Sequence, residues 1–161
     1  MKRNVRNIMF IELFALVLVM VFNIVIGCNS GMGIIYFIDL PSLLLIILFI
    51  VPAMSVMGLW KDFFRSLHVG KRTYSVTQLQ KTVESIKMME KLTICGSTFS
   101  VMVAVMLILV TVDNIELLGP NLAVAILSIL YGAAIEFFLI PLRTNTQIHI
   151  LEMMEYENEE E

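Results

Sequence analysis

Four apolar blocks, each close to twenty residues long, limit what this chain can fold into. They cover residues 8–27, 41–59, 92–112 and 120–142. An α-helix rises about 1.5 Å per residue, so roughly twenty residues cross the hydrocarbon core of a bilayer, which is about 30 Å thick. Each block is therefore long enough to span a membrane once. The sequence predicts an all-α, polytopic membrane protein with four transmembrane helices.

The composition agrees with this prediction. Of the 161 residues 58% are hydrophobic, and the mean hydropathy is +0.88, whereas soluble domains average roughly 45–50% apolar residues. The blocks leave no room for a separate soluble domain of ordinary size. Residues 1–161 are therefore expected to form a single membrane domain.

The first block follows a basic stretch, as the core of a cleaved signal peptide also would. Lys2, Arg3 and Arg6 precede it. The apolar run is long for a signal core, however, and the sequence from Gly27 onward lacks a small-x-small cleavage pattern. We therefore expect an uncleaved first helix, in which Glu12 lies close enough to the basic end to reach water.

Prolines and a capping residue mark the expected ends of the second and fourth helices. Asp39 is placed to cap a helix that begins near Pro41, because proline suits the first turn, where its missing N–H would have no partner. Pro52 lies inside the second block and is expected to kink it. Pro120 is expected to begin the fourth helix, and Pro141 to lie at its end.

The long polar segment, residues 60–91, is expected to form a cytoplasmic helical hairpin. Its turn is expected at residues 69–74, followed by a capping box in which Ser75 caps the helix and Gln78 reaches back. No Gly or Pro interrupts the chain from there until Gly96. The third transmembrane helix is therefore expected to be extended into the cytoplasm.

The basic residues are distributed in a way that predicts the orientation of the chain. All 11 Lys and Arg lie in the N-terminal stretch, within residues 60–91, or at position 143, and the links 28–40 and 113–118 contain none. Because cationic residues stay on the cytoplasmic side during insertion, both termini are expected in the cytoplasm. The basic segment is expected to meet lipid headgroups rather than nucleic acid. The acidic tail, residues 144–161, can continue the fourth helix at its start and is expected to fray at its end.

The sequence offers no constellation for enzyme chemistry. It contains no Ser/His/Asp set, no phosphate-binding loop and no metal-ligand spacing, so we expect neither catalysis nor a cofactor nor a metal. Cys28 and Cys95 are predicted at opposite membrane faces and cannot then pair within one chain.

Polar side chains inside the blocks are candidates for handling ions. Glu136 is a carboxylate in the fourth block that would carry a proton; alternatively, it reaches cytoplasmic water or pairs with a basic residue such as Lys91. The hydroxyls of Ser100 and Ser128 are candidates for lining an ion path. The alternative is hydrogen bonding between helices, which contributes about 0.6 kcal/mol on average in membranes.

Two passages resemble a known family. Residues 37–44, FIDLPSLL, resemble the entrance to the second helix of MotA stator proteins, and residues 119–132, GPNLAVAILSILYG, followed by LIPL at 139–142, resemble their fourth helix. The family is the MotA/TolQ/ExbB group of proton channels, and the resemblance covers all four blocks in order. It implies a ring of five copies around two single-span helices of a MotB- or ExbD-like partner, whose aspartate takes part in ion passage across the bacterial cytoplasmic (inner) membrane.

The resemblance also implies roles for single residues. Pro120 matches the family proline at the start of the fourth helix, and Ser128 matches a hydroxyl that faces the ring interior near the partner carboxylate. Ala125 and Gly132 share that helix face, three residues before and four after Ser128. In the third helix Ser100 lies beside the position of a family threonine, and the proline of stators is missing.

The function implied is a subunit of a proton channel or ion-driven motor complex that assembles as a homo-pentamer. The alternative is a non-conducting oligomeric membrane scaffold. The altered third helix favours that alternative, as does a cytoplasmic segment far shorter than that of true stators.

Overall fold

The structure of the protein is a computed structural model that describes residues 11–18, 21, 39–69 and 74–159. The elements are α2 (Leu40–Val56), α3 (Trp60–Arg65), the 3₁₀ helix η3 (Ser66–His68), α4 (Val76–Val110) and α5 (Ile115–Glu159). Residues 11–18 are helical as well. The described part of the chain is all-helical and contains no strand, as the apolar blocks predict.

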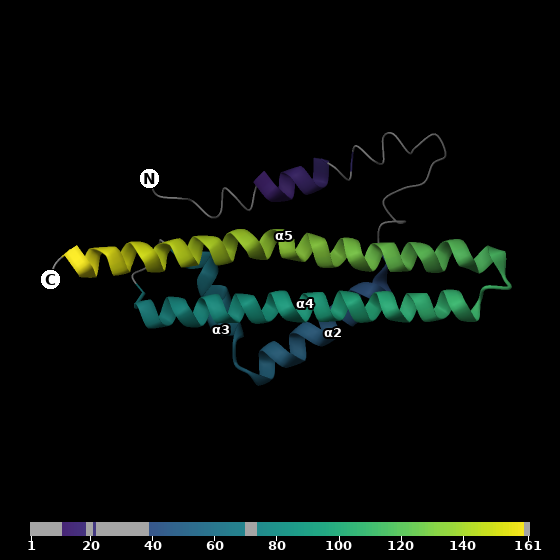
Figure 1. Ribbon diagram of the computed structural model, residues 1–161, viewed down its shortest axis with the longest axis horizontal. Helices are drawn as coiled ribbons and strands as arrows, with labels where there is room; N and C mark the ends of the chain where they lie inside the picture. The colour runs from purple at the N-terminus through teal and green to yellow at the C-terminus, as the bar shows by residue number, and fades with distance from the viewer. Residues whose placement is uncertain (1–10, 19–20, 22–38, 70–73, 160–161) are drawn as a thin grey trace.

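The two longest helices, α4 and α5, form an antiparallel pair that lies side by side along its length (Figure 1). They contain 35 and 45 residues, which corresponds to about 52 Å and 68 Å of helix. A short link joins them, and Asn121 Nδ2 donates to Thr111 Oγ1 across it at 2.9 Å. Both helices are therefore longer than a bilayer core is thick.

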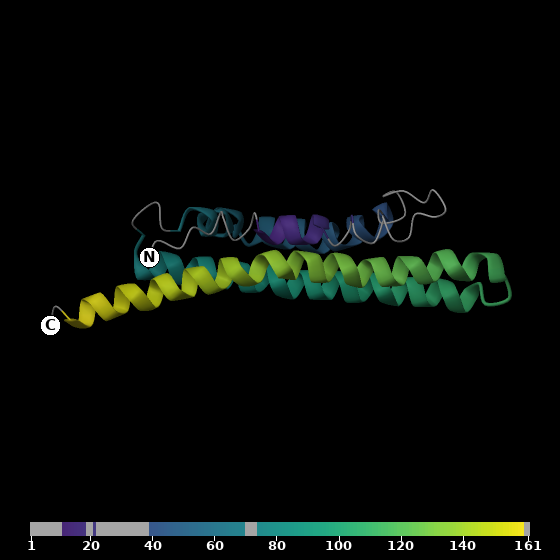
Figure 2. The same ribbon diagram turned by 90° about the horizontal axis from the view of Figure 1, so that it is seen from above.

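The remaining helices pack on one side of this pair. Figure 2 shows α2, α3 and the helix at residues 11–18 on the same side of α4 and α5, and no described helix covers the opposite side. A buried apolar cluster joins α2, α4 and α5; its members are Ile46, Ile50, Met54, Ile86, Met89, Leu139 and Leu142. The core thus lies between three helices and is open to one side.

Two or three of the described helices can span a membrane by length and composition. Helices α4 and α5 each meet both requirements alone. Helix α2 meets them only together with α3 and η3, from which a bend of 99° separates it. The predicted first span, residues 8–27, lies largely outside the described residues. The structure therefore supports a membrane protein, while the count of four spans stays a prediction.

The expected starts of α2 and α4 are confirmed. Asp39 caps α2 by accepting a hydrogen bond from the Ser42 amide at 3.0 Å, and Pro41 lies in the first turn. At the start of α4 the capping box is complete, since Ser75 Oγ accepts from the Gln78 amide and the Gln78 side chain accepts from the Ser75 amide. Helix α4 then continues without a break to Val110, so the third block and the polar segment before it share one helix.

Helix α2 contains Pro52 in its interior, as expected, but ends earlier than the apolar block does. Its last residue is Val56, and Gly58 follows in the left-handed region with φ of 66°. A residue with a Cβ is strained in that conformation. The chain therefore turns sharply there, and Trp60 begins the next helix, α3. The turn expected at residues 69–74 lies mostly outside the described residues.

The expected ends of the fourth helix are wrong. Helix α5 begins at Ile115, so Pro120 lies in its interior, and it continues through Pro141 to Glu159. The start is earlier because Asn114 accepts a hydrogen bond from the Glu116 amide at 3.2 Å, and an acidic residue in the first turn complements the helix dipole. Each interior proline removes one backbone hydrogen bond, which a packed membrane helix tolerates.

The start of the acidic tail continues the helix, as the sequence allowed, and the described helix reaches Glu159. After Pro141, the Leu142 side chain is buried, and Thr146 is fully buried and donates its hydroxyl to the Leu142 carbonyl at 2.8 Å. Packing of this face against α4 holds the helix together beyond the proline. The predicted span, residues 120–142, thus lies wholly inside a longer helix.

Candidate functional site

Three serines from three helices meet in the core at hydrogen-bond distance. Ser128 Oγ on α5 lies 2.8 Å from Ser100 Oγ on α4 and 2.9 Å from Ser42 Oγ on α2. Their exposed fractions are 0%, 2% and 1%. The Ser128 hydroxyl also lies 2.8 Å from the Val124 carbonyl oxygen. We call Ser42, Ser100 and Ser128 the serine cluster.

The hydroxyls of the serine cluster find their partners within one chain. Ser128 carries one proton, and the Val124 carbonyl or the Ser42 hydroxyl can accept it. The remaining lone pairs of Ser128 face Ser42 and Ser100. A hydroxyl buried without a partner costs roughly 1–3 kcal/mol, so this arrangement stabilises the contact of α2, α4 and α5.

The small residues expected beside Ser128 are buried on the same face. Ala125 is 8% exposed and Gly132 is buried. At Gly132 an added Cβ would lie 2.7 Å from Ser97 Oγ, and at Gly96 it would lie 3.1 Å from the Ile46 Cα. Both glycines therefore allow close approach of neighbouring helices, as small residues commonly do in membranes.

The structure places this face toward α2 and α4 of the same chain. Ser128 and Ser100 were expected together near an ion path, and they are in contact. Ser42 was not singled out in the sequence, although its position three residues after the cap Asp39 puts it at the start of α2. The role of the serine cluster in ion passage stays a prediction.

A second polar group, which we call the charged cluster, is the ion pair of Glu90 and Arg143; Glu136 precedes Arg143 on α5. Arg143 Nη1 on α5 lies 2.8 Å from Glu90 Oε2 on α4. Glu90 is 8% exposed, and its Oε1 has no hydrogen-bond partner among the described residues; the same holds for Glu136 Oε1. The cluster therefore joins the two long helices.

Glu136 stood out in the sequence as a carboxylate within an apolar block, whereas Glu90 was not singled out. The suggested partner of Glu136, Lys91, is exposed, and among the described residues no ion pair of Glu136 is present. Glu90 continues the buried face of α4 that contains Leu79, Val83 and Ile86. Its position on that helical stripe, next to the apolar third block, was the signal that could have identified it.

A third carboxylate, Glu12, lies against the C-terminal half of α5. It lines a groove of about 430 Å³ together with residues such as Phe137, Pro141 and Thr144. Glu12 Oε2 is buried and has no hydrogen-bond partner among the described residues. The residue as a whole is partly exposed, so the expectation that the carboxylate of Glu12 reaches water stays a prediction.

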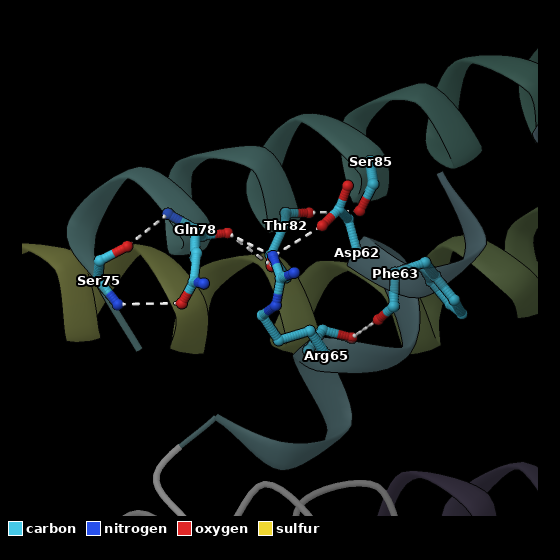
Figure 3. Close-up of polar contacts among 8 residues, drawn as sticks. Asp62, Phe63, Arg65, Ser75, Gln78, Thr82 and Ser85 are labelled. Carbon is cyan, nitrogen blue, oxygen red and sulfur yellow. Dashed lines mark hydrogen bonds and ion pairs between the residues drawn. The ribbon is translucent and has the colours of Figure 1, made fainter. Parts of the chain in front are cut away.

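Polar contacts around Arg65 hold α3 against the start of α4 (Figure 3). Arg65 Nη1 lies 2.7 Å from Asp62 Oδ1, donates to the Gln78 carbonyl at 2.9 Å and to Thr82 Oγ1 at 3.3 Å. Its guanidinium also lies 5.7 Å from the ring centroid of Tyr74. The partners of this arginine are supplied by the chain itself, so we assign it a structural role.

The described residues contain no group of three or more His, Cys, Asp or Glu side chains that could hold a metal ion. The chemistry that the serine and charged clusters can perform is hydrogen bonding, proton binding and ion pairing. No protein-family model, curated protein or solved structure matches the chain.

Proposed function

We propose that this chain is a subunit of an ion-driven membrane complex that resembles MotA/TolQ/ExbB proteins. In this proposal five copies form a ring around a single-span, MotB- or ExbD-like partner in a bacterial cytoplasmic membrane. The observation that carries the proposal is the long antiparallel pair α4–α5, which α2 covers on one side only. Such a pair has a free side on which neighbouring copies or a central partner helix can pack.

Apolar side chains are exposed along both long helices, and this supports contact with lipid or with other helices of an assembly. On α5, Leu122, Ile126 and Ile129 are 54%, 59% and 59% exposed and follow one helix face. On α4, Met102 and Met106 are 60% and 62% exposed. Stripes of this kind require lipid or other helices as cover. In the proposed ring the stripes are divided between lipid, neighbouring copies and the partner.

The arrangement of polar and apolar halves supports the proposed orientation. The N-terminal half of α4 and the C-terminal half of α5 are polar, and they lie at the same end of the pair (Figure 1). That end carries Lys81, Lys87, Lys91 and Arg143, and we assign it to the cytoplasm. The two helices then leave the membrane together, and α3 lies along the cytoplasmic surface.

In the mechanism we propose, the partner's carboxylate carries the ion, and this chain shapes its path. Ser128 and Ser100 lie midway along the apolar part of α4 and α5 and supply hydroxyls that exchange partners when an ion passes. Ala125 and Gly132 keep the helices close, and Glu136 lies on the cytoplasmic side of the serines. Ion passage then shifts α5 relative to α4, and this movement acts on whatever the complex drives.

The experiment that tests this proposal measures ion flux in vesicles. The chain is purified together with the single-span protein encoded beside it, if that protein has an aspartate in its span, and is reconstituted with a proton or sodium gradient. We expect flux that requires both proteins and that is lost in the partner's Asp→Asn variant. Absence of flux from a correctly assembled complex would contradict the channel function.

A specific observation favours the second candidate, a non-conducting membrane scaffold. The serine cluster is satisfied within one chain, as a contact that serves only helix packing would be. The two candidates differ in the Ser128→Ala variant. A scaffold loses stability only, whereas a channel loses flux in the fraction of protein that remains assembled.

A further inference from the structure

The polar end of the α4–α5 pair carries a groove between the two long helices. Its volume is about 480 Å³, and its apolar lining comes from Val83 on α4 and from Ile150 and Leu151 on α5. Glu84 and Lys87 lie at its α4 edge. The Leu151 side chain is 65% exposed. An exposed leucine in an apolar groove indicates a surface that another helix can cover.

The groove and α3 lie on nearly opposite faces of α4. Arg65 on α3 donates to the Gln78 carbonyl and to Thr82 Oγ1, so these two residues mark the face of α4 that α3 covers. An α-helix turns by about 100° per residue, so Glu84 lies about 200° around the helix from Thr82. Figure 2 shows α3 on one side of the pair and no described helix on the other.

The two surfaces also lie at the same level along the pair. The contacts of α3 fall on residues 78–82 of α4, and the groove is lined by residues between 80 and 87 of the same helix. Copies related by rotation about an axis parallel to the pair keep every residue at its own height. Two different faces at one level can therefore meet in a head-to-tail contact, and such contacts close into rings.

The outward face of α3 and η3 is apolar and positively charged. Phe64 and Leu67 are 51% and 38% exposed, and Lys61 is exposed beside them. Asp62 and Arg65 form an ion pair at 2.7 Å, so their charges balance each other. The exposed lysine thus gives this face its net positive charge.

The groove has the complementary character. The Glu84 side chain is 67% exposed at its edge. Glu155 is exposed and lies one helical turn beyond Leu151, on the same side of α5. Residues 144–161 contain six Glu and no Lys or Arg. An apolar face with a positive charge therefore matches an apolar groove with an acidic border.

We propose that this groove is the docking site for a second copy of the chain, which inserts Phe64 and Leu67 of its α3–η3 face. Lys61 of that copy then lies beside Glu155 at the groove's border. The inference rests on the proposed ring and adds which two faces meet in it. Each copy uses α3 on one side and the groove on the other, so the contact repeats around the ring.

The test is disulfide cross-linking of the full chain in membranes, in a Cys28→Ser, Cys95→Ser background. Leu67→Cys combined with Leu151→Cys should give a ladder of linked copies after oxidation. A disulfide joins Cα atoms less than about 7 Å apart, and within one chain these positions lie on opposite sides of the pair, so the link forms only between copies. Leu67→Cys with Met102→Cys is the matched control, because Met102 is exposed but lies about 27 Å further along α4 than Glu84. It should stay unlinked.

Charge reversal gives an independent readout. Lys61→Glu should reduce the yield of the Leu67–Leu151 cross-link, and Glu155→Lys in the same chain should restore it, because the contact then has opposite charges again. Phe64→Cys with Ile150→Cys serves as a second pair if the first fails to fold, which circular dichroism detects. Five copies by native mass spectrometry without either cross-link would overturn this inference and leave the ring in place, whereas a monomer would contradict both. Linked dimers from Leu67→Cys alone would also overturn it, since the α3 face would then pair with itself.

Discussion

Among the four described glycines, Gly132 leaves the least space for an added Cβ, and the atoms that it would meet belong to the neighbouring long helix. A Cβ there would lie 2.7 Å from Ser97 Oγ and 2.8 Å from Ser97 Cβ. Distances this short force either the serine or the helix to move. The α4–α5 contact is therefore sensitive to a single methyl group.

Gly132→Ala is expected to destabilise the protein by about 1–3 kcal/mol, as overpacking of a tight contact does. The loss is measured by unfolding in mixed micelles. Gly119→Ala is the control, because no atom lies within 4 Å of its added Cβ and alanine is favoured over glycine in helices by up to about 1 kcal/mol. In a Ser97→Gly background, Gly132→Ala should destabilise the protein less than it does in the wild type. An equal loss of stability in both backgrounds would show that Ser97 does not limit the space at Gly132.

Ser128→Ala tests the serine cluster at the same scale. The change leaves the hydroxyls of Ser42 and Ser100 without their shared partner, so we expect a loss of about 1 kcal/mol, within the range for hydrogen bonds between membrane helices. Thr98→Ala, an exposed position on α4, is the control and should change stability by less than about 0.5 kcal/mol. A smaller effect for Ser128 than for Thr98 would mean that the cluster does not hold the helices together.

Among the elements, α3 shows how a bend after a span sets the position of the next helix. If α2 crosses the membrane, the bend of 99° between α2 and the segment of α3 and η3 directs α3 along the membrane surface. Trp60 and Phe64 stack there with ring centroids 5.8 Å apart, and Phe64 is 51% exposed. Aromatic residues of this kind favour the boundary between lipid and water.

The depth of Trp60 is measurable because it is the only tryptophan in the chain. Its fluorescence should be quenched most by bromine atoms attached near the lipid headgroup and least by those near the end of the acyl chain. For comparison, Phe49→Trp in a Trp60→Phe background places the probe within α2, where deep bromines should quench best. Strongest quenching of Trp60 by deep bromines would mean that α3 re-enters the membrane.

Helix ends were predictable where a local signal acts alone. Asp39 with Pro41, and Ser75 with Gln78, fix the starts of α2 and α4 through contacts within four residues, and a sequence displays such contacts directly. The ends of α5 depend on packing at a distance. Its continuation past Pro141 accompanies burial of Leu142 and Thr146, which the residues around the proline do not reveal.

The candidate site was predictable only in part, because some of its residues stand out locally in the sequence and others are brought together by packing. Ser100 and Ser128 stand out as hydroxyls in apolar blocks, and the contact between them agrees with that choice. The third member, Ser42, and the Glu90–Arg143 pair result from how three helices align, over sequence separations of 86 and 53 residues. Periodicity places such residues on a face but does not identify what the face contacts.

For the whole molecule, the proposed orientation can be tested with thiol labelling. In a Cys28→Ser, Cys95→Ser background, Asn114→Cys lies in the link between α4 and α5 and should react with a membrane-impermeant reagent added outside intact cells. Tyr74→Cys, at the opposite end of α4, should react only after the membrane is opened. The reverse pattern would invert the topology and remove the basis for a cytoplasmic polar end.

The central claim is that the chain works as a ring around a partner, and the number of copies in the purified complex tests it most directly. Native mass spectrometry of the chain, released from detergent with its single-span partner, gives that number. The account predicts five copies of this chain with two of the partner, and five copies of the chain when it is purified alone. A monomer under both conditions would contradict it.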